Sequence, residues 1–177
     1  MRKSFFLVIA LVLLVSGAAY AASITATLTV EVPSYIYLAF NNASASAEQG
    51  GTDTTIIAGA DWTVPTGGPG TSKFIESGTY DLEVVCTTQW DLAVAGPASL
   101  GSTTIGATNV AALYWKFGAA LPAAYTAFPA ALGFSEPDNA ATGATAATRE
   151  VQFAVPYTWD VIPDTYTGVV TFTATAD

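Results

Sequence analysis

Paired carboxylates are the side chains in this sequence with the clearest capacity for catalysis. Asp81 and Glu83 lie two residues apart in the stretch TYDLEVV. If this stretch is a strand, both point to the same face about 6–7 Å apart, a separation that suits a glycosidase. Acidic residues on the outer face of a strand are also the ordinary pattern of a solvated sheet. The chain has no His, which excludes Ser-His and Cys-His nucleophile systems and the usual zinc ligand sets. We therefore expect a protein that is not an enzyme.

Two further acidic pairs offer oxygen atoms of the kind that calcium prefers. Asp160 and Asp164 flank a turn in WDVIPD, and Glu136 and Asp138 lie in SEPDN. Neither pair has the spacing of a known calcium loop, and Asp is also a common turn-forming residue. The prediction is no bound metal and no cofactor.

Two tryptophans are candidates for contact with a ligand. Trp62 is surrounded by small and turn-forming residues in AGADWTVPTGGPG, and Trp159 follows Thr158 in PYTWDV. An exposed Trp can stack on a sugar ring or anchor a protein partner. The alternative is that both rings cover the core.

The N-terminus resembles a secretory signal peptide. Arg2 and Lys3 precede the apolar run Phe5–Val15, and Ala19-Tyr20-Ala21 fits a cleavage site between small residues. We expect a signal peptide at residues 1–21, a single domain at residues 22–177, and a secreted or cell-surface location. The apolar run is shorter than the roughly 20 residues of a membrane-spanning helix, so no membrane association is expected after cleavage.

Charge and cysteine content restrict the partners. Without Arg2 and Lys3, three basic residues remain against 14 acidic ones, a net charge of −11. Nucleic acids and anionic membranes require a basic face, so neither is expected as a partner.

Cys86 is the single cysteine and shares a face with Leu82 and Val84. This predicts a buried thiol, with an intermolecular disulfide as the alternative.

The segments that must position these residues alternate between polar and apolar side chains. This period of two is typical of half-buried antiparallel strands. The predicted strands are Ile24–Val32, Tyr35–Phe40, Thr79–Thr88, Gln89–Gly96, Leu113–Gly118, Arg149–Pro156 and Tyr166–Ala176. Residues 121–148 read as a loop interrupted by Pro122, Pro129 and Pro137, with room for one helical turn at Pro129–Gly133. Short strands separated by turns predict an all-β fold, a single antiparallel β-sandwich of Ig-like or Greek-key type.

A tyrosine follows a turn at the start of two predicted strands. Tyr80 lies in SGTYDLEVV and Tyr166 in PDTYTGVVTF. In Greek-key sandwiches a Tyr in this position donates its hydroxyl to backbone upstream. Both are therefore candidates for a tyrosine corner.

The two terminal strands are candidates for strand exchange between copies. Ile24, Ala26, Leu28, Val30 and Val32 form one apolar face of the first. The sequence predicts that Tyr166–Ala176 is one uninterrupted strand. A long strand at a sheet edge presents unpaired N–H and C=O groups that can accept a strand from a neighbour. The alternative is that both strands pair within their own sandwich.

The stretch QWDLAV, together with the ending TYTGVVTFTATAD, resembles the WxL group of secreted bacterial surface proteins. Trp90 and Leu92 match that group's first Trp-x-Leu motif, whereas Phe172 and Ala174 stand where the second is expected. The chain is also similar to secreted sandwich subunits of fimbrial and spore-coat type. The resemblance implies non-covalent attachment to cell walls. Two functions are thus predicted: a non-catalytic surface subunit that assembles with itself, or a module that binds cell-wall polysaccharide.

Overall fold

The computed structural model describes residues 33–40, 45–48, 50–51, 61–105, 109–129 and 133–177. Residues 33–177 form one compact unit. The predicted signal peptide and the predicted strand Ile24–Val32 lie outside the described residues. In the described part of the chain, no helix has the length and apolar character needed to cross a membrane.

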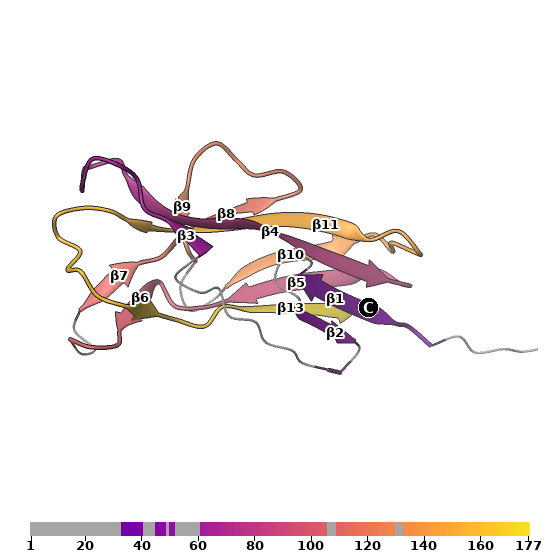
Figure 1. Ribbon diagram of the computed structural model, residues 1–177. Helices are drawn as coiled ribbons and strands as arrows, with labels where there is room; N and C mark the ends of the chain where they lie inside the picture. The colour runs from indigo at the N-terminus through magenta and orange to yellow at the C-terminus, as the bar shows by residue number, and fades with distance from the viewer. Residues whose placement is uncertain (1–32, 41–44, 49, 52–60, 106–108, 130–132) are drawn as a thin grey trace, which may run out of the picture. The chain divides into compact units, whose positions relative to one another are not determined.

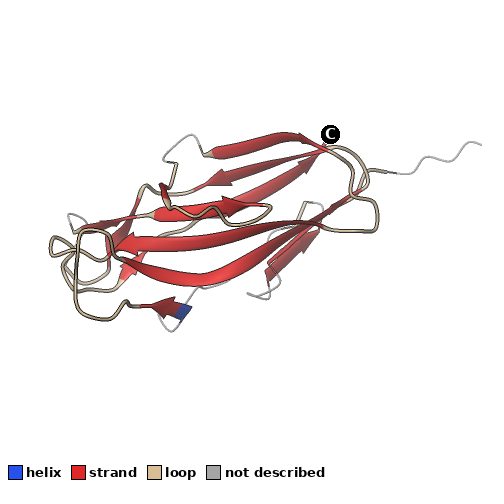
Figure 2. Cartoon of the chain, turned by 90° about the horizontal axis from the view of Figure 1, so that it is seen from above, coloured by secondary structure: helices blue, strands red, loops and turns tan. Residues whose placement is uncertain are grey.

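The unit is built from antiparallel strands in three sheets (Figures 1 and 2). The large sheet has the order β2 (Ala45–Glu48), β1 (Ile36–Phe40), β4 (Phe74–Cys86), β11 (Ala147–Pro156), β8 (Tyr114–Gly118) and β9 (Thr126–Ala127), with β3 (Trp62–Thr63) also paired to β4. The β5 sheet has the order β10 (Phe134–Asn139), β5 (Trp90–Ala95) and β13 (Thr171–Ala176). The β6 sheet has the order β12 (Tyr166–Thr167), β6 (Ser99–Ser102) and β7 (Val110–Ala112). The prediction of an antiparallel β-sandwich is confirmed.

The core lies between the large sheet and the β5 sheet. In β5, Trp90, Leu92 and Val94 are at most 1 % exposed, while the intervening residues face outward. Leu82 and Val84 of β4 meet them from the large sheet, and Cys86 is buried beside them. The two-residue alternation of each strand therefore supplies one apolar face to the core, and the predicted burial of the Cys86 thiol is confirmed.

A β-bulge interrupts the pairing of β4 with β11. Glu76 pairs with Ala154 and Thr79 pairs with Gln152, so Ser77 and Gly78 lie opposite Phe153 alone. The Ser77 side chain compensates for the irregular pairing, because its hydroxyl oxygen accepts the buried N–H of Phe153 at 2.9 Å. A polar residue is thus placed in the core to satisfy a backbone donor that the bulge leaves without a strand partner.

Replacing Ser77 with Ala is expected to destabilise the fold by about 1–3 kcal/mol, since it leaves a buried N–H unsatisfied. Chemical denaturation of the variant measures this loss. Thr173→Ala is the control, because Thr173 is an exposed residue of β13. Equal stability of Ser77→Ala and wild type would show that the hydroxyl does not satisfy the Phe153 N–H.

The prediction that Tyr166–Ala176 is one uninterrupted strand is wrong. β12 pairs with β6, whereas β13 pairs with β5, so the chain leaves one sheet and enters another between Thr167 and Thr171. Gly168 permits this crossing, because a Cβ atom there would lie 2.6 Å from the Leu100 side chain. Val169, next along the chain, is 78 % exposed. Packing against the β6 sheet therefore interrupts a segment whose alternation looks continuous.

The region expected to be a loop also contains strands. β9 and β10 both fall within residues 121–148, and β10 includes Pro137. Pro137 is tolerated because β10 lies at the edge of its sheet. The helical turn suggested for Pro129–Gly133 falls largely outside the described residues, since 130–132 are not described.

One of the two candidate tyrosine corners is confirmed. The hydroxyl of Tyr166 donates to the backbone oxygen of Ile162, four residues upstream, at 2.5 Å. Tyr80 is instead buried in the core at 7 % exposure and contacts Phe40 edge-on. The first tyrosine ties the turn before β12 to its strand, and the second fills space between the sheets.

Candidate functional site

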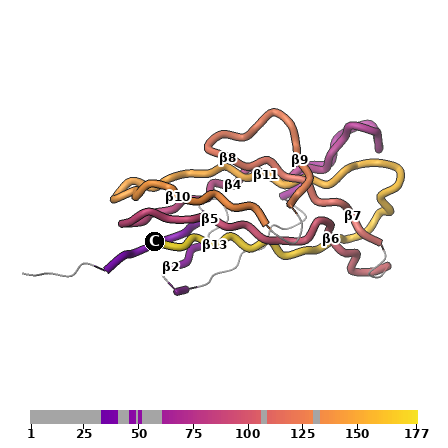
Figure 3. The backbone as a smooth tube through the Cα atoms, turned by 180° about the vertical axis from the view of Figure 1, so that it is seen from behind, coloured from indigo at the N-terminus to yellow at the C-terminus, as the bar shows by residue number. Residues whose placement is uncertain are grey.

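The outer edge of β13 is the strongest candidate for a binding site. β13 pairs with β5 over six consecutive residues without a register shift. Among the described residues no strand pairs with its other side, because β13 ends the order of the β5 sheet. Figure 3 shows β10, β5 and β13 side by side, with β13 at the border of the group. The edge is regular, six residues long, and free of Pro and charge between Thr171 and Ala176.

The direction of the backbone groups on this edge follows from one hydrogen bond. Asp177 donates its N–H to the oxygen of Gln89 at 2.9 Å. In an antiparallel ladder, bonded and non-bonded residue pairs alternate. The odd-numbered residues of β13 therefore bond to β5, and the N–H and C=O groups of Phe172, Ala174 and Ala176 point away from it. These groups are the ones that an added strand would bind.

Apolar side chains line the same edge on the core side. Phe172, Ala174 and Ala176 face inward but are only half-buried, and Leu38 and Phe40 of β1 are half-buried as well. The rings of Phe40 and Phe172 meet edge-on with their centroids 5.0 Å apart. We refer to these five residues as the half-exposed seam. It is a strip of the core that β13 and β1 leave partly uncovered.

The opposite edge of the same sheet is protected against strand addition. β10 contains Glu136 and Pro137, and its register with β5 shifts between Glu136 and Asn139. Asp138 has a positive φ of 57°, which the regular geometry of a strand does not allow. Charge, proline and irregular pairing are the devices by which sheets prevent unwanted edge contacts. β13 has none of these along its six residues.

Arg149 connects the two main sheets at the β10 side. Its guanidinium, on β11, bonds to the Glu136 carboxylate of β10 at 2.8 Å, and both side chains are half-buried. It also donates to the Asn139 side chain at 3.0 Å. Its charged end lies 5.9 Å from the Trp90 ring, whose indole N–H donates to the Ala140 oxygen at 2.9 Å. Trp90 thus lies in the core beneath this ion pair, and Leu92 is buried two residues further on.

The two tryptophans proposed as ligand platforms have different surroundings. Trp62 lies in β3, pairs with Ser77 of β4 and is half-buried against the core. Trp159 follows β11 in a turn and is 82 % exposed. The structure therefore presents one of the two indole rings to solvent.

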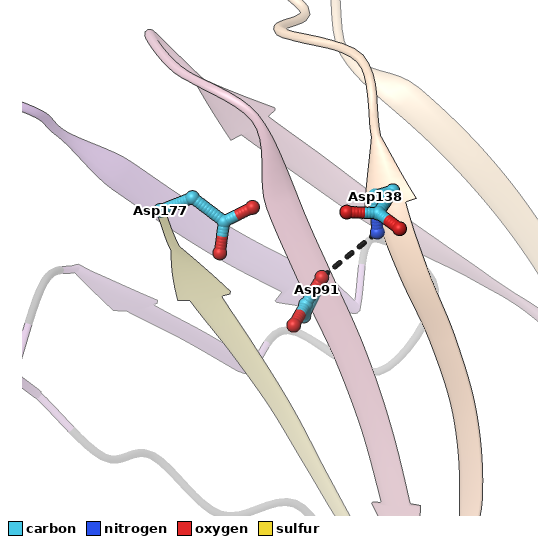
Figure 4. A group of neighbouring side chains, drawn as sticks. All are labelled: Asp91, Asp138 and Asp177. Carbon is cyan, nitrogen blue, oxygen red and sulfur yellow. Dashed lines mark hydrogen bonds between the residues drawn. The ribbon is translucent and has the colours of Figure 1, made fainter.

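Three carboxylates meet at one end of the β5 sheet (Figure 4). Asp91, Asp138 and Asp177 come from or directly follow β5, β10 and β13, and their oxygens lie within 4.8 Å of one another. Asp91 accepts the backbone N–H of Asp138 at 2.9 Å. Three hard oxygen donors at this spacing can contact a divalent cation, and exposed carboxylates also group in this way without one.

This arrangement separates Glu136 from Asp138, one of the acidic pairs proposed from the sequence. Glu136 bonds to Arg149, whereas Asp138 joins Asp91 and Asp177. Nothing in the linear spacing indicated the cluster, because its members lie on three strands that are far apart in the chain.

Asp164 organises the turn before β12. It accepts hydrogen bonds from the Ser102 hydroxyl and from the N–H groups of Ile105 and Thr165. The bond from Ser102 is the main cause that lowers the pKa of Asp164 to about 2. Asp160, four residues earlier, is exposed.

Because the folded pKa of Asp164 lies below its ordinary value of 3.8, its ionised form stabilises the fold above that pH. This contribution is expected to be lost as the pH falls from 3.8 towards 2. An NMR titration should place the carboxyl of Asp164 near pH 2 in the wild type and in its ordinary range after Ser102→Ala. An unchanged value in the variant would mean that Ser102 does not hold the charge.

Asp81 and Glu83 lie on the outer face of the large sheet, as the alternation predicts. Asp81 is opposite Glu150 of β11, and Glu83 is opposite Thr148. This is the position of acids on a solvated strand face. The assignment of the chain as non-catalytic stays a prediction.

Comparison of the chain with models of protein families and with characterised proteins gives no match.

Proposed function

We propose that this protein is a non-catalytic, secreted cell-surface subunit that assembles with itself by strand addition. In this proposal the segment Ile24–Val32 of one copy pairs with the free edge of β13 in another. The assembly would be a filament or a surface layer. Residues 1–21 would direct export and be removed.

The single observation that carries the proposal is the contrast between the two edges of the β5 sheet. The edge of β10 is interrupted by proline, charge and a register shift, whereas the edge of β13 is regular and lies over the half-exposed seam. A strand with one apolar face would satisfy the backbone groups of Phe172, Ala174 and Ala176 and cover the seam in one step. Ile24–Val32 has that face.

The mass of the protein in solution tests the proposal. Residues 22–177 are expected to form oligomers whose mass rises with concentration in analytical ultracentrifugation. A single-chain mass at the highest attainable concentration would contradict self-assembly.

A second candidate function is binding to cell-wall polysaccharide, favoured by the exposed indole of Trp159. At 82 % exposure, this ring is free to stack on a sugar. The resemblance of Trp90 and Leu92 to the WxL motif points to the same ligand.

Under this second function, Trp159→Ala is expected to reduce sedimentation with purified cell wall by roughly tenfold or more, as for the loss of an aromatic anchor. Val169→Ala, at another exposed apolar position, is the control and should bind as wild type does. Equal binding of all three proteins would exclude Trp159 as the platform.

A further inference from the structure

We propose that the added strand runs parallel to β13, in a register that places Ala26 of one copy beside Phe172 of the next. This inference rests on the proposed function and specifies the geometry of the same site. It follows from the sizes of the side chains along the seam and from the different surroundings of the two ends of β13.

The inward side chains that approach and follow β13 change from large to small along the chain. Val170 and Phe172 are large, and Phe172 is packed against Phe40. Ala174 and Ala176 are small and, like Leu38, half-buried, so they leave room for larger side chains of an added strand. An incoming strand therefore needs its smallest inward residue at Phe172 and larger ones further on, because well-packed faces alternate large and small neighbours.

The apolar face of Ile24–Val32 has one small residue, Ala26. With Ala26 beside Phe172, a parallel strand forms three pairs of one large and one small neighbour: Ala26 with Phe172, Leu28 with Ala174, and Val30 with Ala176. An antiparallel strand with the same central pair would instead place Ile24 beside Ala174 and Ala22 beside Ala176. Two small side chains would then meet at Ala176, and the space beside it would stay unfilled.

The two ends of β13 favour the same direction. At its start, β13 is continuous with the segment that leaves β12 in the β6 sheet. Figure 1 shows β6 and β7 at this end and the C-terminus at the other. The rest of the copy that supplies the strand follows Val32. A parallel strand ends past Asp177, so the rest of that copy lies away from the β6 sheet. An antiparallel strand would bring it against the β6 sheet.

The exposed faces agree with this register along most of its length. It places Thr25, Thr27 and Thr29 beside Thr171, Thr173 and Thr175, and Thr–Thr neighbours are favourable across strands. Glu31 lies beside exposed Asp177, an unfavourable pair of like charges whose repulsion the surrounding water weakens.

Cross-linking between separately substituted chains tests the register. Residues 22–177 carrying Thr27→Cys are mixed in urea with chains carrying Thr173→Cys, refolded together and oxidised. The same is done with Thr27→Cys and Thr171→Cys. The parallel register predicts disulfide-linked dimers of unlike chains for the first mixture, and several-fold fewer for the second. Thr171 and Thr173 are exposed, and buried Cys86 is common to all chains, so the wild type gives the background.

The outcomes separate the register from the proposed function. Dimers in the second mixture alone would overturn the parallel register and leave strand addition in place. Neither mixture forming dimers, while wild type assembles, would overturn docking of Ile24–Val32 on β13. A chain carrying both Thr27→Cys and Thr173→Cys that links only within itself would show that the segment covers its own β13, which overturns the second copy as the occupant.

Discussion

Ala174→Pro is expected to abolish oligomers and leave a folded single chain. The N–H of Ala174 points away from β5, as the Asp177–Gln89 hydrogen bond establishes. Proline at this position therefore removes a donor that no strand of the described residues uses and that an added strand would bind, and its ring blocks the edge. The ladder between β13 and β5 keeps its hydrogen bonds, in agreement with the tolerance of edge strands for proline.

Ser135→Pro is the matched control on the opposite edge. Ser135 is exposed and lies opposite Ala93, whose backbone groups face β13, so its own N–H points away from β5. Sedimentation should give a single-chain mass for Ala174→Pro and the wild-type distribution for Ser135→Pro, with cooperative thermal unfolding of both. If Ala174→Pro assembles as readily as wild type, the β13 edge is not the site.

Trp90→Ala is expected to lower the free energy of unfolding by about 3–5 kcal/mol, the range for removing a large aromatic side chain from a core. Trp90 is 1 % exposed, and its ring lies beneath Arg149. The substitution also leaves the Ala140 oxygen without its indole donor. Urea denaturation at a concentration where the protein is monomeric measures the loss.

The comparison with Trp159→Ala distinguishes a core role from a binding role. Trp159 is 82 % exposed, and its removal should change stability by at most about 0.5 kcal/mol. A stable Trp90→Ala variant that loses binding to cell wall would instead assign Trp90 to a ligand site. The difference between the two variants therefore tests the placement of the Trp-x-Leu motif in the core.

The residues that form the core could be predicted from the local sequence. Trp90 and Leu92 alternate with polar or small neighbours, and Asp81 and Glu83 flank Leu82, because side chains of a strand point to opposite faces in turn. This rule depends only on backbone geometry within a few residues. It predicts strands and their inner faces before any pairing is known.

Prediction from the local sequence was wrong where contact with another segment of the fold outweighs the local pattern of side chains. The alternation from Tyr166 to Ala176 continues through Gly168, yet the approach of Leu100 divides it into two strands in different sheets. In β10, Pro137 and two acidic residues led to the prediction of a loop, although a strand with these residues is stable at the edge of a sheet. In both cases packing against other segments outweighed the local signal.

By itself, the sequence determined that this protein is an all-β sandwich with Trp90, Leu92 and Cys86 inside, because alternation is a local property of extended backbone. The tertiary structure alone decided which edge of the β5 sheet has no strand partner among the described residues, since that depends on which strands pair. It also brought Asp91, Asp138 and Asp177 together, and placed Ser77 beneath the N–H of Phe153. These contacts join residues that are 39 to 86 positions apart in the chain. The alignment of strands so far apart in the chain is set by the packing of the whole sandwich.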